Sequence, residues 1–155
     1  MPASIRSSGH SHRYGEIMST AAPNDQEGSV GGYQPMPIAR LGELLASCAE
    51  ADRWLMISEF LEEHRHEPRE RRLALLQDEP APTGDERWDV FLAALAEYLA
   101  AKDGRRGPRW CEQRHLYRFW FPFNTPLARA EAIVRAPAAF RRRGVMVARM
   151  ELENA

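Results

Sequence analysis

The stretch TGDERWDVFLAALAEYLAAK, residues 83–102, decides the fold of this chain. Its large apolar residues recur at steps of three and four over three turns, which is the period of one helix face. Thr83 and Glu86 form the S/T-x-x-E pattern of a capping box, and Gly104 suits the left-handed position that ends a helix. We therefore expect a helix over 84–102 at the centre of the core, with Trp88, Phe91, Leu92, Leu95 and Leu99 facing inward.

Three more helices are predicted before this one. A first, over about 38–50, has an apolar stripe, and Asp52 is placed to cap a second helix. Pro68 occupies the first turn of a third helix, which ends near Asp78. The inward residues expected for the three are Ile38, Leu41, Leu44, Leu45 and Cys48, then Trp54, Ile57, Phe60, Leu61 and His64, then Leu73 and Leu76.

The C-terminal part has a less regular pattern. A short helix is expected over His115–Trp120, and Thr125-Pro126 is a typical start for a helix over 126–135. That helix is predicted to bury Leu127, Ala130, Ile133 and Val134. Ala136-Pro137 begins another short helix, which contains Phe140 and stops at Gly144, and Val145–Val147 is prone to form either a short strand or an extended edge.

The predicted fold is mainly α, a small irregular domain of about five to seven helices over 37–155, with room for one short C-terminal strand. Residues 1–36 are rich in Ser, Gly, Pro and Ala and have no apolar period, so we expect a disordered N-terminal tail. Met18 and Met36 are alternative initiators to Met1. No apolar run approaches the roughly 20 residues of a membrane span.

The formal net charge of −1 hides two halves of opposite sign. The acidic half, 37–104, has 8 basic and 15 acidic residues, a net charge of −7. The basic half, 105–155, has 11 arginines and 4 glutamates, a net charge of +7. Either the halves pack together and neutralise each other, or the basic half presents a surface to an acidic partner or to nucleic acid.

Arginines alternate with aromatic residues in the basic half, a pattern that can bind phosphates while bases stack on the rings. The simpler interpretation is that the aromatic residues fill the core, because the run Phe119-Trp120-Phe121 is too apolar to stay exposed. A protein interface is the third interpretation. The candidate polyanion-binding residues are Arg105, Arg106, Arg109, Arg141, Arg142 and Arg143.

No sequence motif names a reaction. Arg109 and His115 fit the Arg-x4–6-His spacing of HEPN ribonucleases, but Arg6 and His12 fit it too, and about two such pairs are expected by chance. Cys111 and His115 share the spacing of two metal ligands without a second pair to complete a zinc site. We therefore predict no catalytic, metal or cofactor residues, with a HEPN-like ribonuclease kept as a third hypothesis.

The segment from Leu41 to Glu153 resembles a group of small uncharacterised actinobacterial proteins. These look like the antitoxin partners of nucleotidyltransferase-type toxins in two-gene modules. The resemblance implies a cytoplasmic bacterial protein that binds and restrains a toxin encoded nearby, and it carries no catalytic residues. It depends on the strings at 59–63, 84–97, 118–121 and 136–144.

Two functions follow as hypotheses. The first is a non-enzymatic, antitoxin-like binding protein whose acidic half covers the basic cleft of the toxin. Its expected partner-binding residues are Glu59, Glu62, Glu63 and Glu67, with Trp54 and Trp120 as buried anchors. The alternative is a nucleic-acid-binding transcriptional regulator that uses the basic half.

Overall fold

The computed structural model describes residues 32–155, and Gln34–Ala155 form one compact unit. The tail predicted over 1–36 therefore lies, up to residue 31, outside the described residues. Met36 packs against the core, and its backbone N–H donates to the Glu63 carboxylate over 2.8 Å. The compact unit thus begins a few residues before the predicted boundary at 37.

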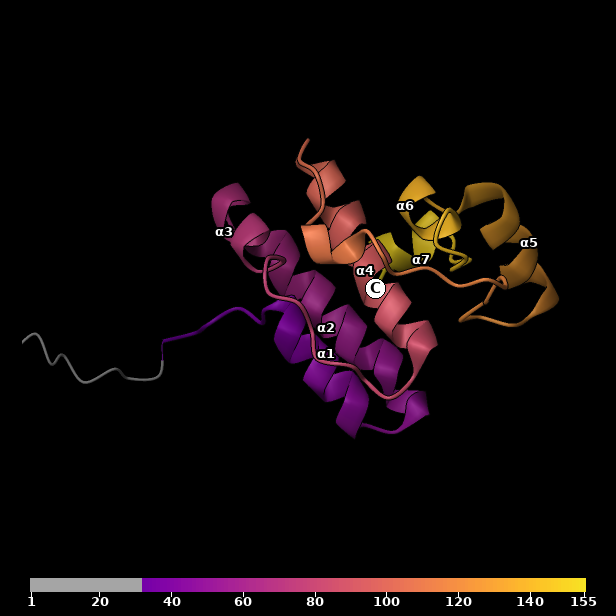
Figure 1. Cartoon of the computed structure of the whole chain (residues 1–155), viewed down its shortest axis with the longest axis horizontal. Coiled ribbons are helices and arrows are strands. Elements are labelled where there is room, and N and C mark those ends of the chain that lie inside the picture. Colours follow the sequence, from indigo (N-terminus) through magenta and orange to yellow (C-terminus); the bar gives the residue numbers. More distant parts are fainter. Residues whose placement is uncertain (1–31) are drawn as a thin grey trace, which may run out of the picture. The chain divides into compact units, whose positions relative to one another are not determined.

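The described residues are mainly helical, as the sequence predicts, and contain seven α-helices, two 3₁₀ turns and no strand (Figure 1). The first four helices are α1 (Ile38–Ser47), α2 (Arg53–His66), α3 (Arg69–Ala74) and α4 (Glu86–Lys102). The basic half holds α5 (Pro126–Arg135), α6 (Ala138–Arg141) and α7 (Arg149–Glu153). The 3₁₀ turns are η1 (Glu50–Asp52) and η2 (Arg109–Cys111).

Helix α4 is the central element, in agreement with the prediction from 83–102. It contacts α1 on one side and α6 and η2 on the other, so this helix joins the rest of the acidic half to the basic half (Figure 1). Four of its five alanines are buried as well as its large residues, which is the pattern of a helix surrounded by others. Gly104 follows it with φ of +69°, the left-handed position expected there.

The start of α4 differs from the predicted capping box. The N-cap is Asp85, whose carboxylate accepts from the Arg87 N–H, and Glu86 is exposed. The Thr83 hydroxyl donates instead to Asp89 over 2.7 Å, and the Thr83 N–H donates to the same carboxylate oxygen over 2.8 Å. The connector before the helix is therefore fixed by Asp89, one turn further along than the pattern indicates.

The boundaries in the acidic half also shift. Helix α1 ends at Ser47 rather than near 50, and Arg53 satisfies a free carbonyl at its end by donating to Leu45 O over 3.2 Å. The predicted Asp52 cap is wrong, because η1 leads directly into α2 and holds Asp52 in a helical backbone conformation without a side-chain cap. Helix α3 ends at Ala74, earlier than the predicted Asp78.

The predicted helix over His115–Trp120 is absent. This segment runs extended beside 143–146: the Leu116 N–H donates to Arg143 O, and the Trp120 N–H donates to Gly144 O, both over 2.8 Å. Trp120 forms a parallel bridge with Val145, so Val145–Val147 is a buried extended edge and not a strand. Gly144 has φ of +81°, and a Cβ there would lie 2.9 Å from Leu116 O, so glycine permits this close pairing.

Helix α5 is oriented opposite to the prediction. Its bounds agree, and Thr125 caps it by accepting from the Ala128 N–H over 3.2 Å. However, its buried face consists of small residues, with Ala132 packing beside Ala136 and Met146. The residues predicted to be buried, Leu127, Ala130, Ile133 and Val134, are all exposed.

Candidate functional site

The acidic stripe on the outer face of α2 is the first candidate surface. We define it as Leu55, Glu59 and Glu62, which are four and three residues apart and therefore lie on one face of the helix. All three are exposed, and Glu59 makes no ion pair with any described residue. Ser58, Glu59, Glu62, Glu63 and Ala155 line a wide, shallow hollow there.

Glu62 is the most closely surrounded acid of the stripe. Its carboxylate accepts from Arg65 over 2.7 Å and from His66 over 2.9 Å. The hydrogen bond from His66, aided by the charges of Arg65 and His66, lowers the pKa of Glu62. The lowered pKa keeps Glu62 ionised, and Arg65 and His66 are themselves exposed surface groups.

Two other predicted partner-binding acids are less available. Glu63 is half-buried because its carboxylate accepts the Met36 N–H. Glu67 is only 8% exposed, and it pairs with Arg71 over 3.3 Å at the end of α2. The assignment of Glu67 to the exposed acidic surface is therefore wrong: its side chain closes the junction between α2 and α3.

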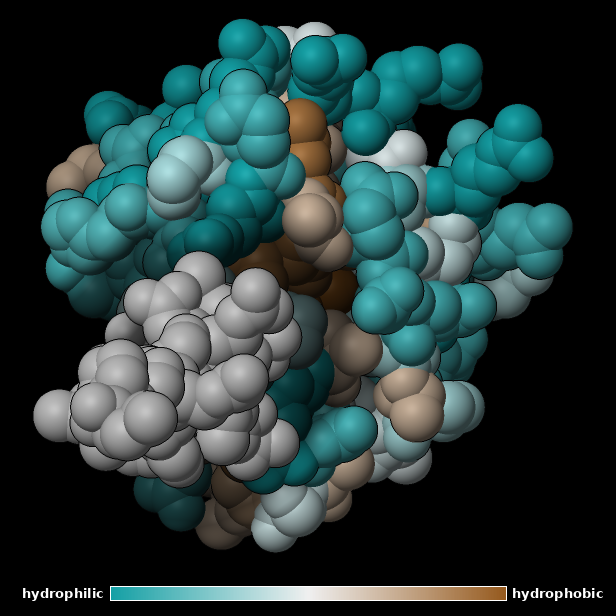
Figure 2. Space-filling view, turned by 90° about the vertical axis from the view of Figure 1, so that its left-hand side faces the viewer, coloured by the Kyte–Doolittle hydropathy of each residue, from teal (hydrophilic) through white to brown (hydrophobic). Residues whose placement is uncertain are grey.

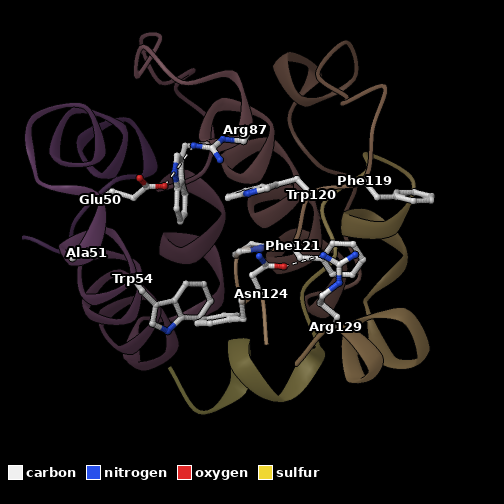
Figure 3. Close-up of a pocket in the computed structure, with 12 residues that line it drawn as sticks. Glu50, Ala51, Trp54, Arg87, Phe119, Trp120, Phe121, Asn124 and Arg129 are labelled. Carbon is white, nitrogen blue, oxygen red and sulfur yellow. Dashed lines mark hydrogen bonds and ion pairs between the residues drawn. The ribbon is translucent and has the colours of Figure 1, made fainter. Parts of the chain in front are cut away.

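The aromatic hollow is the second candidate, and it brings Trp54 and Trp120 together (Figure 3). It measures about 530 Å³ and lies between the α2 end of the acidic half and the extended segment 119–124. The Trp54 ring packs edge-on against Phe123 at 4.6 Å, and the Trp120 ring packs edge-on against Trp88 at 5.0 Å between centroids. Both predicted anchors thus lie away from the acidic stripe, half-buried within the fold.

Two arginines border the aromatic hollow. Arg87 lies 5.3 Å from the Trp120 ring centroid and pairs with Asp85 over 2.7 Å, which raises the pKa of Arg87 and lowers that of Asp85. Arg129 lies over Phe121 at 4.2 Å and donates to Asn124 Oδ1 over 2.9 Å. Arg129 has no carboxylate partner among the described residues, so the hollow has an uncompensated positive charge on that side.

The aromatic run divides between core and surface. Trp120 and Phe121 are half-buried, in line with the expectation that they fill the core. Phe119 is 69% exposed, and Tyr117 is more exposed still. The expectation that the whole run stays covered is therefore wrong for Phe119, whereas Trp120 packs against the main core and Phe121 against the cluster of Ala132, Ala136 and Met146.

The arginine triplet 141–143 is used mainly within the fold. Arg143 is only 6% exposed, pairs with Glu97 and donates to Cys111 O over 2.8 Å. Arg142 pairs with the same glutamate, and Arg141 donates to the Ile133 carbonyl over 3.0 Å. Arg143 is therefore not a polyanion-binding residue, and the charge of Arg142 is compensated.

The remaining predicted polyanion-binding residues lie in or near the loop after α4. Arg105 and Arg106 help line a basic hollow of about 710 Å³, together with Arg114 and His115. Neither Arg105 nor Arg106 makes an ion pair with a described residue. Arg109, in η2, is exposed and is not part of this lining. The HEPN-type pair is thus divided: His115 faces the hollow, where its ring contacts Tyr117, and Arg109 does not.

Cys111 also reaches the basic hollow but is buried, and burial raises the pKa of its thiol to about 12. A thiol with this pKa is a weak nucleophile and a weak metal ligand at neutral pH. Within residues 32–155, no three His, Cys, Asp or Glu side chains are grouped so as to hold a metal ion.

Ion pairs join the two halves of opposite charge. Glu97 of α4 meets Arg142 and Arg143, and Glu79 accepts from Arg114 over 2.8 Å. Because of these ion pairs, the opposite charges of the two halves are partly compensated inside the fold.

The side of the unit on which α1 and α3 lie in Figure 1 is covered largely by hydrophilic side chains, with apolar residues visible in a narrow strip (Figure 2).

The exposed outer face of α5 is the surface that the sequence analysis missed. We define it as Leu127, Ala130, Ile133 and Val134. The periodic signal was present, but it was assigned to the core. The small residues at 128, 132 and 136 form an equally regular stripe on the opposite side, and they are the ones that pack inward.

Comparisons with protein-family models, with curated proteins and with solved structures find no match to this chain. Among the helices that the structure describes, none has the length and apolar character needed to cross a bilayer.

Proposed function

We propose that this chain is a non-enzymatic, antitoxin-like binding protein that restrains a partner enzyme through the acidic stripe of α2. The single observation that supports this proposal is the exposure of Leu55, Glu59 and Glu62 along one face of a fourteen-residue helix. An apolar side chain beside two carboxylates combines a residue that can be desolvated with charges that attract a basic surface.

The resemblance of the sequence to antitoxin partners suggests which enzyme is restrained. Nucleotidyltransferases bind nucleotide phosphates, and phosphate sites are lined by arginine and lysine side chains. Glu59, which has no cationic partner among the described residues, would pair with such a side chain directly. Glu62 would exchange its contacts with Arg65 and His66 for contacts with the enzyme. Leu55 replaces the two predicted tryptophans as the anchor, because Trp54 and Trp120 are held within the aromatic hollow.

Co-expression with the product of the neighbouring gene tests this proposal. The unchanged chain is expected to co-purify with that protein and to inhibit its nucleotide transfer. Reversing two charges, with Glu59→Lys and Glu62→Lys, is expected to weaken binding by at least about ten-fold and to restore transfer. The matched control reverses two exposed acids outside the stripe, Asp78→Lys and Glu112→Lys, and is expected to keep binding. Failure to co-purify, or equal losses in both variants, would contradict the proposal.

Nucleic-acid binding is a second candidate because Arg105, Arg106 and Arg109 are exposed arginines without ion pairs among the described residues. Binding through them would weaken steeply with added salt, since phosphate contacts release counterions. Titration of labelled duplex DNA and RNA at two salt concentrations tests this. Absent binding at low salt, or binding unaffected by Arg105→Gln with Arg106→Gln, would reject it.

A further inference from the structure

Helix α5 turns its large aliphatic residues outward. Leu127 and Val134 are 74% and 73% exposed, and Ile133 is 56% exposed. The inward side is made of alanines, with Ala132 and Ala136 packing on Met146. Burial of Leu, Ile and Val side chains stabilises a folded protein, so this orientation leaves a favourable contribution unused within the described residues.

The outer face of α5 forms one continuous stripe. Leu127, Ala130 and Val134 follow the i, i+3, i+7 spacing of a helix face, and Ile133 widens it. Leu127 and Val134 are seven residues apart, so at the helical rise the stripe is about 10 Å long. Contiguous apolar surface of this kind is typical of a protein-binding site, whereas single exposed apolar residues are ordinary.

Both ends of α5 are fixed, so the stripe is presented on a preformed helix. Thr125 caps the N-terminus, and Arg141 donates to the Ile133 and Val134 carbonyls at the C-terminus over 3.0 and 3.3 Å. A preformed helix has already lost the conformational freedom that a disordered segment must lose on binding. Proteins commonly cover an apolar helix face of this kind by packing a second helix along it.

The charges around the stripe determine whether a partner should be acidic or basic. Glu131 on one flank is paired with Arg135 over 3.2 Å, so this flank is neutral. Arg129 on the other flank contacts only Phe121 and Asn124, and Arg141 at the C-terminal end contacts only carbonyl oxygens. The uncompensated charges at the rim are therefore positive, and the complementary partner is acidic.

The geometry points to the outer face of α5 as a docking site for an amphipathic helix of a partner protein, with an apolar stripe flanked by Asp and Glu. A symmetric pairing of two α5 helices brings Arg129 and Arg141 of each copy toward the same interface, which like-charge repulsion disfavours. This surface lies on a different element from the acidic stripe of α2, so the inference holds independently of the proposed function.

The experiment selects binders to the full chain from a displayed library of helical peptides about four turns long. Enriched peptides are expected to carry an apolar stripe with Asp or Glu beside it. Their affinity for the Leu127→Gln, Val134→Gln variant should fall by at least about ten-fold, because two contact side chains are lost. The matched control, Met150→Gln, changes an exposed apolar residue of α7 that belongs to neither surface, and it should keep full binding.

Three outcomes overturn the inference. The first is enrichment of peptides flanked by Lys or Arg, or of none that depend on Leu127 and Val134. The second is a concentration-dependent dimer, seen by sedimentation, that the double variant abolishes, since the occupant would then be a second copy. The third is a clear fall in the melting temperature of the double variant, since the face would then be covered by the chain itself.

Discussion

The buried guanidinium of Arg143 shows how much one residue depends on a single counter-charge. Burial lowers the pKa of Arg143, and its Nε atom has no hydrogen-bond partner. Glu97 compensates the charge, and Cys111 O accepts from the other side of the group. A buried ion that loses its partner is far more costly than an exposed one, because water cannot replace the lost interaction.

We therefore expect Glu97→Gln to lower the free energy of unfolding by about 2–3 kcal/mol, since the amide keeps the shape but not the charge. Urea denaturation measures this. Glu62→Gln is the matched control: Glu62 also has two partners, Arg65 and His66, but it is exposed, so its loss should have a much smaller effect. Equal effects of the two substitutions would show that burial does not set the strength of the Glu97 interaction.

His64 gives the fold a pH dependence. It is buried in α2, with Nε2 donating to Arg72 O over 3.2 Å. Burial, helped by the charges of Arg72 and Lys102, lowers the pKa of His64 below its usual 6.5, although Asp103 opposes the shift. The unfolded chain therefore binds this proton more readily than the folded chain does. The stabilisation from neutral His64 is complete above pH 6.5 and is lost as the pH falls through the lowered pKa.

The free energy of unfolding is thus expected to decrease from pH 6.5 downward, by at most about 1.4 kcal/mol per pH unit from this one group. Glu62, Asp85 and Asp103 also have lowered pKa values, but carboxyl groups titrate at lower pH. Denaturation of His64→Gln at a series of pH values should show a flatter dependence. The variant at the exposed His66, His66→Gln, is the control. If it flattens the pH profile equally, the pH dependence does not come from His64.

At the scale of single elements, the start of α4 tests which side chain fixes the connector. Asp89 accepts both the N–H and the hydroxyl of buried Thr83, whereas Glu86 has no partner among the described residues. Asp89→Ala should therefore cost about 1–2 kcal/mol, since it leaves the buried Thr83 N–H without an acceptor and the hydroxyl with Asp85 O alone. Glu86→Ala should cost less than about 0.5 kcal/mol. Thermal or urea unfolding measures both, and the reverse order would restore the capping box predicted from the sequence.

Helices α4 and α5 show what periodicity can and cannot predict. In α4 the apolar residues lie on all sides of the helix. The prediction that it is buried therefore does not depend on which face is taken as the inward one. In α5 two stripes compete, one of large aliphatic residues and one of alanines, and the period alone cannot say which side meets the core. In the structure the alanines at 132 and 136 are the residues that pack beside Met146 and Phe121.

The prediction of a helix over 115–120 was wrong for a related reason. Its composition suits a short helix, but its backbone hydrogen bonds go to residues 143–146, which are far away in sequence. Of the candidate binding residues, Glu59 and Glu62 lie on the predicted exposed face, whereas Glu67 and Arg143 are buried. The partner of Arg143 is Glu97, which is far away in sequence, so local spacing cannot reveal this pair. The longer helices were therefore predictable, and long-range pairing was not.

At the scale of the whole unit, α4 and α5 belong to different packing clusters. Helix α4 lies in the main core, whereas α5 is held by the small cluster of Ala132, Ala136 and Met146, with Phe121 beside it. Few buried apolar contacts mean that a segment can open without unfolding the rest. Because its large side chains face outward, we expect α5 to be weakly attached to the core.

Hydrogen exchange tests this difference. The amides of α4 should exchange only through global unfolding, and those of α5 should have protection factors at least about ten-fold lower. Adding a selected acidic helical peptide should raise the protection of α5 and leave α4 unchanged, because binding to the closed helix adds to the free energy of its opening. The Leu127→Gln, Val134→Gln variant, the control, should show no such gain. If α5 is already as protected as α4 in the free chain, its attachment to the core is stronger than the packing indicates. The expectation that α5 opens locally would then be wrong.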